Sequence, residues 1–98
     1  MNLIEPINKV FYIAVYDITN PKKLPKVLKT FRKYMNWVQN SAFEGYLTAK
    51  QYQSLKEKLS AIINKEKDSI IFYYAEEQKH IGKKIIGTEK NEITQILK

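Results

Sequence analysis

A run of β-branched and aromatic residues from Val10 to Ile18 constrains the fold more than any other segment. It predicts a strand, and because side chains alternate along a strand, both faces of this one are apolar. Such a strand must be covered on both sides. The chain has only 98 residues, so we expect one domain over 1–98, with a core at about 9–88 and a tail at 89–98. A second subunit could supply the second cover.

Two amphipathic segments separate the predicted strands. Apolar residues recur at helical spacing through 24–35 and through 52–63. Directly before the second segment, Thr48 and Gln51 form a capping-box pattern that predicts a helix start. Further strands are predicted at 37–47, 69–75 and 83–88. We therefore expect an α+β fold, a ferredoxin-like sandwich of the βαββαβ type, with an antiparallel sheet and two helices on one face. Aromatic side chains on the other face predict a symmetric homodimer through that face or its rim.

Charge and composition narrow the function. Seventeen lysines and arginines against ten acids give a net charge of +7, which favours polyanionic partners, nucleic acid first and acidic lipid second. The absence of cysteine excludes disulfides and thiolate chemistry, and a single histidine excludes a multi-histidine metal site within one chain. Three isolated glycines form no phosphate loop. Without a membrane-length apolar run or a signal-peptide core, we expect a cytoplasmic protein with no membrane partner.

The first predicted helix carries the densest basic surface of the chain. Its cations could neutralise several phosphates of RNA or of duplex DNA. Lysine supplies point charge without the bidentate base contacts of arginine, so we expect binding to the backbone without sequence specificity. A solvated charged face is the ordinary alternative. The candidate nucleic-acid-binding residues are Lys22, Lys23, Lys26, Lys29, Arg32 and Lys33.

Asp17 is the best candidate for chemistry, since it ends the first strand immediately before a turn. A carboxylate there suits a divalent cation, although capping of the turn or helix is the commoner role. One carboxylate is few for Mg²⁺, but a two-fold dimer could bring two together. Ser41 could orient a metal-bound water or a phosphate, with Phe43 in support. The alternative is a half-buried strand at a subunit contact, which is the commoner role for a residue such as Phe43. Tyr16 points to the opposite face from Asp17 and is expected to pack.

Two sequence motifs flank the basic helix: the segment FYIAVYDIT (11–19) precedes it and WVQNSAFEGYLT (37–48) follows it. With this pair of motifs the chain resembles the CRISPR-associated Cas2 family. The later DSIIFYYA (68–75) agrees with the third strand of that family. The resemblance covers about residues 9–88, and the first two motifs together are fairly specific.

The resemblance implies a dimer in which Asp17 of each subunit binds Mg²⁺ at the cleft. It implies a metal-dependent endonuclease acting on single-stranded RNA or double-stranded DNA, which takes part in spacer acquisition with the Cas1 integrase. One departure is Trp37, where some nuclease-active relatives have an arginine that could stabilise the transition state. Two alternatives stay open: a non-catalytic DNA-binding scaffold of the integrase complex, and a toxin-like ribonuclease of the same fold.

Overall fold

The computed structural model describes residues 8–77 and 80–88. Strands and helices follow one another in the order β-α-β-β-α-β-β. Among the described residues, no helix is both long and apolar enough to span a bilayer. The elements are β1 (Lys9–Asp17), α1 (Leu24–Arg32), β2 (Asn36–Gln39), β3 (Ala42–Thr48), α2 (Ala49–Ile62), β4 (Ser69–Glu77) and β5 (His80–Gly87).

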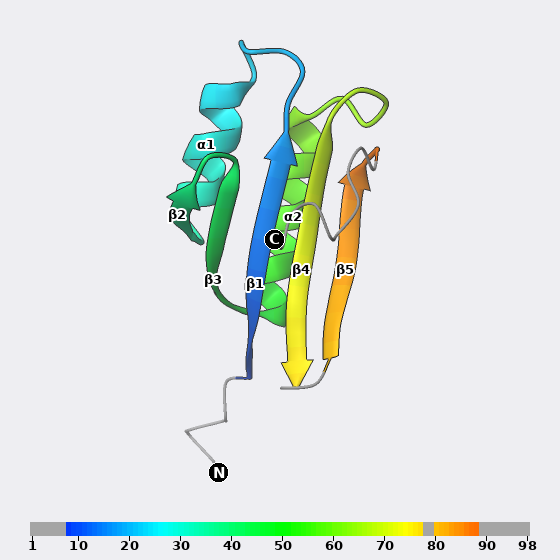
Figure 1. Cartoon of the computed structure of the whole chain (residues 1–98). Helices are drawn as coiled ribbons and strands as arrows, with labels where there is room; N and C mark the ends of the chain where they lie inside the picture. The colour runs from blue at the N-terminus through cyan, green and yellow to red at the C-terminus, as the bar shows by residue number, and fades with distance from the viewer. Residues whose placement is uncertain (1–7, 78–79, 89–98) are drawn as a thin grey trace.

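The strands form one sheet in the order β2-β3-β1-β4-β5. Every neighbouring pair is antiparallel, and β1 lies in the centre, where Ala14 is opposite Phe43 on one side and Phe72 on the other. Both helices lie against the same face of this sheet (Figure 1). The expected α+β class, with an antiparallel sheet and two helices, is therefore confirmed.

The core fills the space between the sheet and the helices. Alternate residues of β1, among them Tyr12 and Ala14, point toward the helices and are buried. The helices contribute apolar side chains at helical spacing, with Val27 and Phe31 from α1 and Leu55 from α2. The two periodicities of the sequence therefore meet in one apolar layer.

The opposite face of β1 carries the other half of the apolar run. Phe11 and Ile13 are half-buried there, and Phe11 packs against Tyr46 of β3 with ring centroids 5.0 Å apart. The Tyr46 side chain is 64% exposed. No helix among the described residues lies on this side of the sheet (Figure 1).

The prediction of a single strand over 37–47 was wrong. This segment forms two antiparallel strands, β2 and β3, which pair Trp37 with Phe43. The chain reverses at Asn40, whose φ of 45° lies in the left-handed region. Asparagine tolerates this conformation better than other non-glycine residues, which explains why the apolar alternation continues through a turn. Ser41 accordingly lies in the turn and not on a strand face.

The helix boundaries follow local signals. Thr48 caps α2: its Oγ1 accepts the Gln51 backbone N–H at 3.1 Å, and the Gln51 Oε1 accepts the Thr48 N–H at 2.9 Å. This confirms the capping box. The first helix begins at Leu24 with Pro25 in its first turn, where a missing N–H costs nothing. The predicted tail at 89–98 lies outside the described residues.

Candidate functional site

Asp17 and Ser41 line the same surface pocket. Asp17 is the exposed last residue of β1, and Ser41 is in the β2–β3 turn. Four more residues complete the lining, from β1, from the position directly after it and from the start of α1: Val15, Tyr16, Ile18 and Leu24. The structure therefore brings the two candidate residues together, although they are far apart in the sequence.

Backbone and side-chain hydrogen bonds attach the turn to β1. The Tyr16 backbone N–H donates to the Ser41 carbonyl oxygen at 3.0 Å. The carbonyl oxygen of Asn40 accepts the indole Nε1–H of Trp37 at 3.0 Å, and the Tyr16 hydroxyl at a longer 3.4 Å. Two side chains thus donate to the carbonyl oxygen of Asn40. Together with the Tyr16–Ser41 backbone bond, they fix the position of Ser41 relative to the end of β1.

Tyr16 and Phe43 support this pocket from inside the core. Phe43 is fully buried and stacks on Phe31 of α1, with centroids 4.7 Å apart and planes at 10°. The Tyr16 ring is buried beside both. Tyr16 therefore packs as expected, and Phe43 is a core residue that holds α1 against β3 under the turn.

Asp17 is the carboxylate that lines this pocket and could contact a cation. Among the described residues, no group of three or more His, Cys, Asp or Glu side chains converges on one point. Protein Mg²⁺ sites often use only one or two carboxylates and leave the other positions to water and substrate phosphates. The single carboxylate of Asp17 is compatible with that pattern.

The basic surface follows directly after Asp17. A loop leads from the end of β1 to α1, whose first turn contains no acidic residue (Figure 1). Lys23 differs from the other five cations, since it is half-buried and lines a pocket with Asp68. The exposed members of the predicted set are Lys22, Lys26, Lys29, Arg32 and Lys33.

Asp68 is a structural residue that sequence reasoning did not single out. Its carboxylate is buried and accepts the backbone N–H groups of Thr19 and Asn64, each at 2.8 Å. Burial alone would raise the pKa of Asp68, but these N–H donors, together with the Thr19 hydroxyl and the charge of Lys23, outweigh it and hold the pKa below its usual value. The carboxylate therefore fixes the loop that follows Asp17. Its position directly before a predicted strand was the only available signal.

Comparison with known proteins establishes the family. The sequence model of the family described as CRISPR associated protein Cas2 matches residues 10–81. The chain belongs to the Cas2 family.

Curated relatives match this chain over most of its length and of their own. A Cas2 named as a CRISPR-associated endoribonuclease from Dictyoglomus turgidum is 44% identical over 90% of this chain and 100% of its own. The protein of the same name from Thermotoga maritima is 42% identical over 85% and 94%. A crystal structure of a Cas2 protein covers 88% of this chain and 95% of its own, with a TM-score of 0.67 and 30% identity. The expected Cas2 resemblance is therefore confirmed.

Proposed function

We propose that this Cas2 protein is a magnesium-dependent endonuclease that cleaves single-stranded RNA, duplex DNA or both, and that Asp17 holds the metal. The observation that carries the proposal is the shared pocket of Asp17 and Ser41, which opens beside the one-signed basic surface of α1. The endoribonuclease names of the relatives support RNA as a substrate.

The chemistry assigns a separate task to each group. Bound Mg²⁺ would supply a Lewis acid and an activated water at neutral pH. The Asp17 carboxylate would hold it at the strand end, and the Ser41 hydroxyl, fixed by the Asn40 turn, would orient a phosphate oxygen. The cations of α1 would hold the phosphates on either side of the scissile bond.

The proposal includes a symmetric homodimer of ferredoxin-like subunits. The sheet face without helices, which carries Phe11, Ile13 and the exposed Tyr46, is the surface available for a second copy. A two-fold axis would place two Asp17 side chains in equivalent positions. An axis that passes beside the end of β1 would thereby bring a second carboxylate to the metal.

The decisive experiment compares wild type, Asp17→Asn and Ser41→Ala on labelled single-stranded RNA and duplex DNA, with Mg²⁺ or with EDTA. Glu57→Gln is the matched control, since it removes one exposed carboxylate from α2. Asp17→Asn should lose about 100- to 1,000-fold in rate, the value of a few kcal/mol of metal stabilisation. Dimer formation, measured by light scattering, should be unchanged. Cleavage that persists in Asp17→Asn or in EDTA would reject the metal role of Asp17.

A non-catalytic role in spacer acquisition is the second candidate, and the five exposed cations of the basic surface favour it. We propose that this surface holds the backbone of duplex DNA in a complex with the Cas1 integrase. Here Asp17→Asn should leave integration unchanged, while charge reversal at Lys26 and Lys29 should abolish it. Loss of integration in Asp17→Asn together with normal DNA binding would argue for the catalytic role instead.

A further inference from the structure

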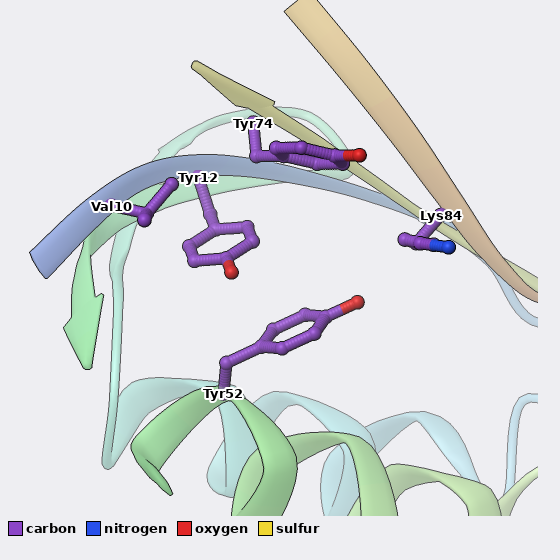
Figure 2. A pocket seen from close by; sticks show the side chains of 5 residues that line it. All are labelled: Val10, Tyr12, Tyr52, Tyr74 and Lys84. Carbon is purple, nitrogen blue, oxygen red and sulfur yellow. The ribbon is translucent and has the colours of Figure 1, made fainter. Parts of the chain in front are cut away.

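A second pocket lies at the opposite end of β1 from Asp17. Val10 and Tyr12 of β1, Tyr52 of α2, and Tyr74 and Lys84 of β4 and β5 line it (Figure 2). Asp17 lies five positions along the extended strand from Tyr12, or about 17 Å at ~3.3 Å per residue. The pocket is therefore distinct from the proposed nuclease site.

The aromatic walls of this pocket are held in place by packing. The Tyr12 and Tyr52 rings stack with centroids 4.5 Å apart and planes at 8°. Phe72 meets the Tyr52 ring edge-on at 5.2 Å, and the Lys56 ammonium lies over the same ring, 5.0 Å from its centroid. These contacts fix the direction in which the Tyr52 hydroxyl points.

The Tyr52 hydroxyl is buried, and none of the described residues forms a hydrogen bond with it. Leaving a buried hydroxyl unpaired costs about 1–3 kcal/mol, so such a group calls for a partner. Burial, followed by the nearby Tyr12 and Tyr74 phenols, raises the pKa of Tyr52 to about 12. The hydroxyl therefore keeps its proton at physiological pH and can donate it to an acceptor.

Gly82 makes room for the phenol ring of Tyr74. A Cβ at this position would collide with the ring of Tyr74, which lies opposite Gly82 in the β4–β5 register. Two residues further along β5, Lys84 is opposite Phe72 and so belongs to the sheet face that carries the helices. Figure 2 shows the hydroxyls of Tyr52 and Tyr74 on the side of the pocket where Lys84 lies.

We propose that this pocket binds a small phosphate-bearing anion. A lysine ammonium and a protonated tyrosine hydroxyl are hydrogen-bond donors, which suits an anionic oxygen acceptor. Among the described residues that line the pocket there is no carboxylate to repel an anion. The phosphate oxygens would accept from Lys84 and Tyr52, and would thereby pair the buried hydroxyl. The site needs neither Mg²⁺ nor Asp17, so it stands independently of nuclease activity.

Two forms of phosphate are distinguished by experiment. The full chain, uniformly labelled with ¹⁵N, is titrated in EDTA with inorganic phosphate or with adenosine 5′-monophosphate, at constant ionic strength so that general screening does not change. Saturable amide shifts are expected around Gly82 and Lys84 and not along α1. Tighter binding of the nucleotide would show that the phosphate is nucleotide-borne, and equal binding that free phosphate suffices.

Matched variants test the assigned groups. Lys84→Gln and Tyr52→Phe should each weaken binding at least tenfold, whereas Lys65→Gln and Tyr46→Phe, which change the same residue types at exposed positions elsewhere, should not. Without ligand, Tyr52→Phe should melt at the same or a higher temperature than wild type, since it removes an unpaired hydroxyl. Absence of saturable shifts with both probes, or unchanged affinity in Lys84→Gln, would overturn the proposal.

Discussion

The buried carboxylate of Asp68 accepts the backbone N–H of Thr19 at 2.8 Å, across 49 positions of the chain. A second bond reinforces the same junction, because the Thr19 hydroxyl donates to the Lys67 carbonyl oxygen, also at 2.8 Å. Together they fasten the loop after β1 to the loop before β4. Since Asp17 directly precedes this loop, the position of the proposed metal ligand depends on Asp68.

Replacing Asp68 should destabilise the protein. Asp68→Asn removes the charge and places an amide against two backbone N–H donors, and the loss of charge-assisted bonds at a buried site costs about 1–3 kcal/mol. Urea unfolding measures the free-energy change. Glu66→Gln, an exposed acid in the same loop, is the control and should remain near wild type. Equal stability of all three proteins would mean that the carboxylate contributes nothing net.

The same carboxylate makes stability fall in acid. Because the folded-state pKa of Asp68 is lower than its unfolded value, its contribution is present above the ordinary aspartate range. It is lost as the pH falls below about 4 and through the depressed pKa. Unfolding free energies measured from pH 6 to pH 2 should therefore decline less steeply in Asp68→Asn than in wild type. Parallel curves would contradict this.

The turn at Asn40 should control both stability and cleavage. Asn40→Ala puts a side chain with no local hydrogen bonds into the left-handed region, at a cost of about 1 kcal/mol. Asn40→Gly should be near wild type in stability. Asn36→Ala, on the extended strand β2, is the control. If Ser41 acts as proposed, RNA cleavage should fall in Asn40→Ala, and undiminished cleavage would separate Ser41 from the reaction.

The salt dependence of nucleic-acid binding should show whether the basic surface contacts the phosphates. Changing Lys26, Lys29 and Arg32 to Gln together should weaken binding to all sequences alike. The slope of log K against log salt should decrease by about 0.9 for each lost duplex contact, and by about 0.7 on single strands. Lys50, Lys65 and Lys67, exposed lysines outside α1 that are changed to Gln together, provide the matched control of equal charge. An unchanged slope in the α1 variant would place the contacts elsewhere.

The loss of stability at alkaline pH should depend on Tyr52. Its folded pKa of about 12 lies above the ordinary tyrosine pKa of 10.0, so the unfolded chain releases this proton first. The contribution of Tyr52 is therefore complete below pH 10 and is lost as the pH rises toward 12. Tyr52→Phe should decline less over this window than wild type, while Tyr46→Phe should match wild type. Identical decline in all three would mean that the Tyr52 environment does not disfavour the phenolate.

Much of the fold could be predicted because its signals are local. The apolar run at Val10–Ile18, the helical spacing of Val27 and Phe31, and the Thr48 capping box each depend on residues within a few positions. The same holds for Asp17 as the last residue of a strand. The β2–β3 turn was missed because Asn40 makes it with neither glycine nor proline, the strongest turn signals in a sequence.

The sequence by itself determined the two helices, the central strand, the basic surface and the Cas2 motifs. Only the tertiary structure decided that Ser41 and Asp17 line one pocket, that Asp68 holds the Thr19 loop, and that Tyr52 and Lys84 line another. These pairings join residues far apart in the chain, and they depend on strand order and register. Strand order follows from burying one apolar face of the whole sheet at once, a requirement that no short segment of sequence contains.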